Sequence, residues 1–103
     1  MAHKGLSPET VVKAAAELIE QQGRETFSMR ALADHLGVKT ASLYNHVDHM
    51  EGLLADVCRY GLCLQKETEL QGIEGKHGEE AVRILADTYR SFAKEHKELY
   101  WLI

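Results

Sequence analysis

The stretch FSMRALADHLGVKTASLYNHV, residues 27–47, decides the fold. Its first part predicts a short helix, because four apolar residues recur three or four positions apart and share one face: Met29, Leu32, Ala33 and Leu36. Ser28 precedes this helix, where its hydroxyl can accept a hydrogen bond from a backbone N–H group. Gly37 follows it, and a glycine there favours the positive-φ conformation that ends a helix and turns the chain.

A second short helix is expected from about Thr40 to His46, with Leu43 and Val47 pointing inward. Its outer face is polar and rich in hydrogen-bonding groups, and consists of Lys39, Thr40, Ala41, Ser42, Tyr44, Asn45 and His46. Two short helices joined by a glycine turn form the helix-turn-helix pattern. The second helix of such a pair can enter a DNA major groove, although the same pattern also occurs in helical bundles that do not bind DNA.

The distribution of charge favours the DNA-binding interpretation. The whole chain is acidic, with 12 Lys and Arg against 16 Asp and Glu, yet no acidic residue lies between Lys39 and Val47. Phosphate repels carboxylates, so an acid-free face is typical of a helix that lies against DNA. Five basic and five acidic residues precede Asp48, and seven basic and eleven acidic residues follow from there, so the excess acid lies in the second half.

Composition predicts an all-α fold. The 103 residues are 45% hydrophobic, include one proline and show no alternating strand pattern. Neither a secretory signal nor a membrane-spanning apolar run is recognisable, so we expect a cytoplasmic protein with no membrane contact. Cys58 and Cys63 lie five residues apart on one predicted helix and point in different directions, so we expect reduced, partly buried thiols.

The remaining helices are read from their caps and apolar stripes. Ser7-Pro8-Glu9 predicts the start of a helix that runs to about Gln22 and ends at Gly23. Phe27 is expected to fill the core between this helix and the next. The first helix is expected to bury an apolar stripe of six residues, namely Val11, Val12, Ala15, Ala16, Leu18 and Ile19.

A longer helix is predicted to follow the helix-turn-helix and to reach about Leu70. Asp48 is expected to cap it, with Glu51 reaching back as in a capping box. Its expected apolar stripe consists of Met50, Leu53, Leu54, Val57, Cys58 and Leu62. The glycine-containing segment from Gly72 to Gly78 then predicts a flexible loop that separates this first part from the rest.

One more amphipathic helix is predicted from Glu79 to about Lys94. Its apolar face is expected to carry Val82, Leu85, Tyr89 and Phe92. The final segment, Leu99-Tyr100-Trp101-Leu102-Ile103, is wholly apolar and needs a partner to cover it. We therefore expect the sequence to be the front part of a longer protein.

Taken together, these motifs resemble the DNA-binding head of the TetR/AcrR repressors. The resemblance covers roughly Leu6 to Leu64 and rests on several features of the sequence. These are Ala14-Ala15, Gly23, Ala31-Leu32-Ala33, Gly37-Val38, the run Leu43-Tyr44-Asn45-His46-Val47, and Leu53-Leu54. It implies a three-helix head with a helix-turn-helix in residues 6–64, a long connecting fourth helix, and in residues 65–103 the incomplete start of a ligand-binding and dimerisation domain.

The resemblance also implies a function and a set of contacts. The protein would be a transcriptional regulator, most simply a repressor that binds a palindromic operator as a homodimer and is released by a small-molecule effector. Positions that face DNA in the family match Lys39, Thr40, Ala41, Ser42, Tyr44 and Asn45, and Tyr44 and His46 match positions that hold the phosphate backbone. We add Ser28 and Arg30, at the start of the preceding helix, as candidate DNA contacts. Tyr89, Phe92 and Tyr100 are candidate effector-binding residues, although the periodicity alone favours plain helix packing.

Three positions depart from the family pattern. Lys39 stands where a serine often caps the reading helix, so Thr40 is expected to cap instead. Met50 stands where a lysine usually meets phosphate, and losing that charge would weaken the salt-dependent part of DNA binding. Val47 replaces a frequent phenylalanine in the core.

Other functional classes have less support in the sequence. His46 and His49 with Cys58 do not complete a four-ligand metal set, so we predict no metal and no cofactor. Helical cysteines on apolar stripes are usually core residues, and no feature indicates an enzyme. The main alternative is a helical protein-interaction module without DNA binding, favoured by the acidic second half and the apolar end.

Overall fold

The computed structural model describes residues 6–102, and within them the chain is all-α, as predicted. Six α-helices and one short 3-10 helix follow each other without a strand among the described residues. Their bounds are α1 Pro8–Gln22, η1 Arg24–Thr26, α2 Met29–Leu36, α3 Thr40–Leu43, α4 Met50–Gly72, α5 Gly78–Glu95 and α6 Lys97–Tyr100. None of these helices is both long and apolar enough to cross a membrane.

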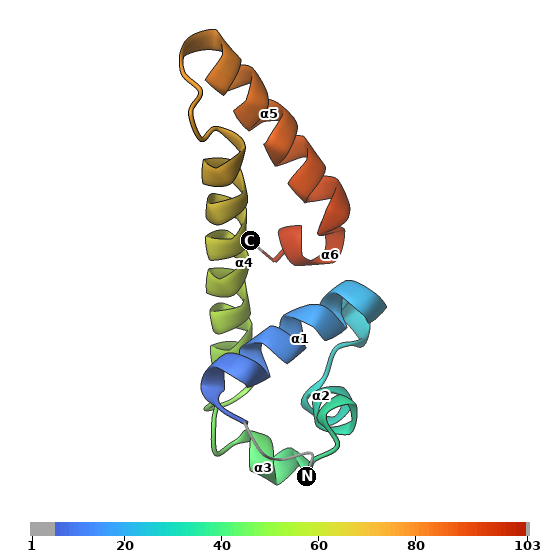
Figure 1. The fold of residues 1–103 in the computed structure, drawn as a ribbon. Helices are drawn as coiled ribbons and strands as arrows, with labels where there is room; N and C mark the ends of the chain where they lie inside the picture. The colour runs from blue at the N-terminus through green and yellow to red at the C-terminus, as the bar shows by residue number, and fades with distance from the viewer. Residues whose placement is uncertain (1–5, 103) are drawn as a thin grey trace.

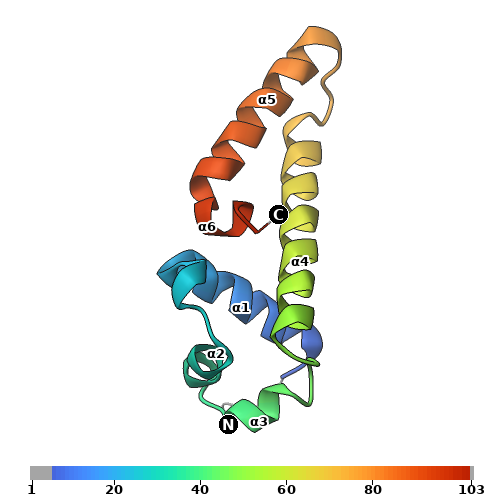
Figure 2. The same ribbon diagram turned by 180° about the vertical axis from the view of Figure 1, so that it is seen from behind.

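Helix α4 is the axis of the molecule (Figure 1). Helices α1, α2 and α3 gather at its N-terminal end, and α5 runs back from its far end towards them. Figure 2, from behind, shows the same arrangement, with α6 lying between the end of α5 and α1. With 23 residues, α4 is about 34 Å long.

The ends of α1 and α2 are fixed as the sequence predicts. The Ser7 hydroxyl accepts a hydrogen bond from Thr10 N, and the Thr10 hydroxyl accepts one from Ser7 N, which completes a capping box. The Ser28 hydroxyl accepts a hydrogen bond from Ala31 N at 3.0 Å. Gly37 ends α2 with φ 72° and ψ 30°, the left-handed conformation that glycine adopts at low cost.

One core unites the helices of the head. The six predicted residues of α1 are all buried, and Leu32 and Leu43 are fully buried beside them. Phe27 packs against this cluster as expected, and Val38 packs against it from the glycine turn. The buried cluster consists of Val11, Val12, Ala14, Ala15, Ala16, Leu18, Ile19, Met29, Leu32, Ala33, Leu43, Val47, Leu53, Val57 and Leu99.

The predicted start of α4 is wrong. The helix begins at Met50 with His49 as its N-cap, and no side chain caps it. Asp48 lies one residue too early to reach the N–H groups of the first turn, and Glu51 is therefore the second helical residue instead of the third. The expected capping box does not form.

Parts of the predicted apolar stripes are also wrong. Leu62 is 51% exposed and Cys63 is exposed, because α4 leaves the head core after Gly61. On α5, Val82 is 66% exposed, whereas Phe92 is buried as predicted.

The end of α4 approaches α5 closely: a Cβ on Gly72 would lie 3.1 Å from the Thr88 hydroxyl and 3.5 Å from the Ile84 side chain.

The apolar C-terminal segment has a partner within the chain. Helix α6 packs against α1, and Leu99 is fully buried in the head core. Leu102 packs against the same cluster, and its carbonyl oxygen accepts a hydrogen bond from Cys58 Sγ at 2.9 Å. The segment that follows the loop therefore returns to the head.

Candidate nucleic-acid interface

Helix α3 is held by its two inward residues. Leu43 is fully buried and Val47 is 7% exposed, so both anchor the segment in the head core as predicted. The α-helix itself ends at Leu43, earlier than expected, and residues 44–46 continue as a tighter turn. In that turn, Asn45 N donates to Ser42 O and His46 N donates to Leu43 O, the pattern of a 3-10 helix.

The tighter turn preserves the outward face of this segment. Tyr44 is 47% exposed, and Lys39, Ala41 and Asn45 are exposed as well. Thr40, Ser42 and His46 are half-buried at the edges of this face. The structure thus brings seven candidate residues together on one segment, which we call the reading segment, residues 39–46 without Leu43.

Capping of α3 differs from expectation. Lys39 occupies the N-cap position with no side-chain hydrogen bond, and Thr40 is the first helical residue. Thr40 therefore does not take over the cap, because a capping side chain must come from the residue before the first turn.

The two candidates on α2 lie at its N-terminal end. Arg30 is exposed, and Ser28 is half-buried with its hydroxyl accepting the bond from Ala31 N. Helix α2 packs directly against α3, so the exposed guanidinium and the exposed ammonium of Lys39 belong to the same part of the head. Acidic side chains flank the reading segment at Asp34 and Asp48, but none lies within it.

Of the three aromatic candidates for effector binding, Phe92 is buried, whereas Tyr89 and Tyr100 form a hydrogen-bonded pair. Phe92 is 3% exposed, and its ring lies 4.5 Å from that of His96. The hydroxyls of Tyr89 and Tyr100 lie 2.7 Å apart, with their rings edge to face at 6.0 Å. This hydrogen bond is the main cause that raises the pKa of Tyr89 above its ordinary value.

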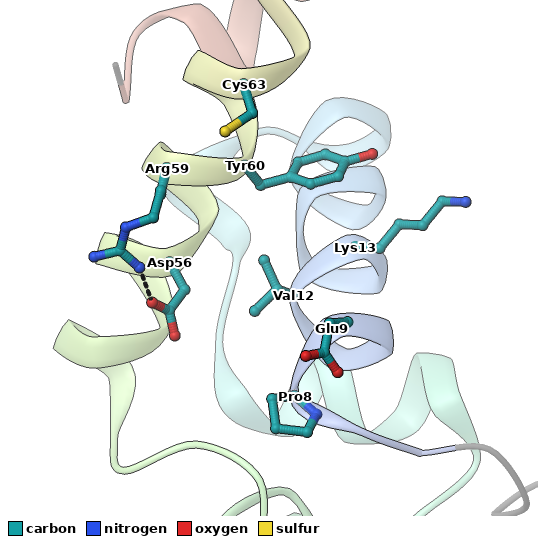
Figure 3. Close-up of a pocket in the computed structure, with 8 residues that line it drawn as sticks. All are labelled: Pro8, Glu9, Val12, Lys13, Asp56, Arg59, Tyr60 and Cys63. Atoms are coloured by element: carbon teal, nitrogen blue, oxygen red, sulfur yellow. Dashed lines mark hydrogen bonds and ion pairs between the residues drawn. The ribbon is translucent and has the colours of Figure 1, made fainter.

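A separate groove of about 570 Å³ lies on the head between α1 and α4 (Figure 3). It is lined by Pro8, Glu9, Val12, Lys13, Asp56, Arg59, Tyr60 and Cys63. Arg59 and Asp56 pair with each other at 2.6 Å. Within residues 6–102, no group of three His, Cys, Asp or Glu side chains could hold a metal ion.

Sequence reasoning missed the contacts of α6 with the head. Glu98 accepts a hydrogen bond from Arg24 N, and its carboxylate lies 3.6 Å from the Arg24 guanidinium. His96 and Glu20 pair through Nδ1 and Oε1. The apolar run after Glu98 signalled that a partner was needed, but nothing in the sequence indicated which surface it would be.

Comparison with known proteins agrees with this geometry. The family model described as bacterial regulatory proteins of the tetR family matches residues 11–57, from near the start of α1 into α4. The uncharacterized HTH-type transcriptional regulator Rv0681 of Mycobacterium tuberculosis is 36% identical over 96 residues, which cover 92% of this chain and 44% of that protein. The uncharacterized HTH-type transcriptional regulator YobS of Bacillus subtilis is 31% identical over 96 residues, covering 93% and 50%.

The chain spans about half the length of these two relatives. The match covers α2, the glycine turn and α3, which are the elements on which the predicted resemblance rested. The resemblance is therefore confirmed. Residues 11–57 therefore belong to the tetR family of bacterial regulatory proteins.

Proposed function

We propose that this chain reads DNA through the reading segment, as part of a ligand-released repressor that binds a palindromic operator as a homodimer. The observation that carries the DNA-binding part is the acid-free polar face held outward by buried Leu43 and Val47. Such a face presents donors and acceptors to base edges without repelling phosphate. Residues 6–64 would form the reading head, and residues 65–103 would begin the regulatory domain.

The proposed contacts divide by chemistry. Asn45 can make two hydrogen bonds to adenine, and Lys39 can meet guanine or phosphate. Tyr44 and His46, at the end of the segment, would hold the phosphate backbone, and Ser28 and Arg30 would add phosphate contacts from α2. Met50 brings no charge to the start of α4, so fewer phosphates would be neutralised there and the salt dependence of binding would be shallower.

A homodimer and a palindromic operator are proposed together. One α3 reads a short site, whereas two heads related by a two-fold axis would read two half-sites about one helical turn apart. Random-sequence selection with the full-length dimer tests this proposal. Enrichment of an inverted repeat with a fixed spacing supports it, whereas enrichment of a single asymmetric site would contradict it.

Release by an effector is proposed to act through α4. This helix begins three residues after the buried Val47 and extends about 34 Å to Gly72, where it meets α5, the helix that carries the candidate effector residues Tyr89 and Phe92. An effector that prefers one orientation of α4 would change the spacing of two heads by no more than its differential affinity allows. In the full-length dimer, two glycines at Val57 and Cys58 should reduce effector-induced release more than effector binding. If the helix is disrupted and effector-induced release is unchanged, α4 does not transmit the effect of the effector to the heads.

The alternative is a helical interaction module. Exposed apolar side chains on α4, α5 and the last turn favour it, namely Leu62, Leu70, Val82 and Trp101. A mobility shift with duplex DNA at low salt separates the two functions. An interaction module would leave the DNA unshifted, whereas a reading head shifts it and loses affinity as salt rises.

A further inference from the structure

Helix α6 is tied to the segment that leads into the helix-turn-helix. Glu98 Oε1 accepts a hydrogen bond from Arg24 N at 3.2 Å, although the two residues are 74 positions apart. The same oxygen lies 3.6 Å from Arg24 Nη1. Arg24 is the first residue of η1, and only Phe27 and Ser28 separate η1 from α2.

Other contacts hold α6 at this place. Leu99 is fully buried in the head core, and His96 pairs with Glu20 near the end of α1. The Arg24 guanidinium lies 5.7 Å from the centre of the Trp101 ring, within the range of a cation–π contact. Glu98 also lies against Gly23, where a Cβ would come within 3.5 Å of its carboxylate. The junction of α1 and η1, which we call the α1–η1 corner and which contains Gly23 and Arg24, is therefore held by contacts with α6 as well as by its own backbone turn.

We propose that Glu98 is a positioning residue for DNA binding: by fixing Arg24 it sets the direction in which α2, and hence the reading segment, leaves α1. This proposal rests on the proposed function, because it concerns how the same DNA-reading face is oriented. The contact between Glu98 and Arg24 would be a second connection, besides α4, between the head and the later part of the chain. The Glu98 side chain itself would not contact DNA.

The chemistry of Glu98 gives a graded set of variants. Glu98→Gln keeps an oxygen that can accept the bond from Arg24 N and loses only the charge. Glu98→Ala loses both interactions. The matched control is Asp87→Ala, which removes a carboxylate from an exposed ion pair with Arg90 on α5. Since an exposed ion pair contributes little to stability, none of the three variants should unfold the protein.

The first measurement is the affinity for a fluorescein-labelled duplex at low salt, by anisotropy. Glu98→Ala should weaken binding about fivefold or more, the lower end of couplings between separate sites. Glu98→Gln should retain most of the affinity, and Asp87→Ala should bind as the unaltered chain does. Equal binding by Glu98→Ala and the unaltered chain would overturn the inference while leaving the proposed function intact. No binding by the unaltered chain would instead refute the proposed function.

The second measurement separates positioning from stability. Trp101 is the single tryptophan of the chain and lies beside Arg24, so its fluorescence reports on this corner. Coupling is reciprocal, so duplex binding should change the Trp101 emission in the unaltered chain, and the change should shrink in Glu98→Ala. Thermal melts should show similar stability for both proteins. A merely structural Glu98 would lower the melting temperature and leave the DNA-induced Trp101 change intact, which would overturn the proposal.

Discussion

Replacing Leu99 by alanine tests whether α6 belongs to the core of the head. Leu99 is fully buried among residues of the head, although it follows the rest of that cluster by more than forty positions. Truncating a fully buried leucine removes its transfer free energy and leaves a cavity, at a cost of about 2–5 kcal/mol. For a domain of this size each kcal/mol lowers the melting temperature by about 4–8 °C, so we expect a decrease of at least about 8 °C.

The matched control is Leu62→Ala on α4. Leu62 is 51% exposed, so its truncation removes little buried surface, and alanine favours the helix. Circular dichroism at 222 nm during heating, with urea unfolding as a second probe, measures both variants. Equal melting temperatures for the two variants would show that α6 does not pack on the head, and would refute the arrangement in which the end of the chain returns to α1.

Three further changes test local features. Gly37→Ala forces a side chain into φ 72° and should cost about 1–2 kcal/mol in urea unfolding; an unchanged midpoint would contradict the left-handed turn. Ser28→Ala removes the cap of α2 and should cost about 1 kcal/mol by the same assay, and no loss would mean that the bond to Ala31 N does not form. Tyr100→Phe removes the main cause that raises the pKa of Tyr89, so alkaline absorbance titration should show Tyr89 ionising at lower pH; an unchanged titration would refute the hydroxyl pair.

The sequence predicted the head better than the rest, for a physical reason. In α1 and α2 the caps, the helical period and the ending glycines all indicate the same boundaries, and Ser7, Ser28 and Gly37 act as expected. At the start of α4, the sequence predicted Asp48 as the N-cap. The N-cap is His49 instead, because the tight turn after Leu43 shifts the first helical residue to Met50.

The second half depended on contacts between residues far apart. The amphipathic pattern of α5 indicated a face with Val82 and Tyr89, but these side chains are exposed because α5 meets α4 through other residues. The destination of Leu99 is set by packing against α1, and no local pattern encodes it. The outward face of the reading segment was predictable because it follows from the local spacing of the buried residues Leu43 and Val47.

The central claim is that the reading segment binds DNA, and duplex affinity as a function of salt tests it most directly. Anisotropy should show binding at low salt that weakens as salt rises. Lys39→Glu should reduce the affinity strongly at every duplex sequence and make the salt dependence shallower, since it places a carboxylate on the acid-free face. Lys66→Glu, the same charge change at an exposed position on α4, should have a much smaller effect. Equal loss in the two variants, or none in either, would contradict the claim.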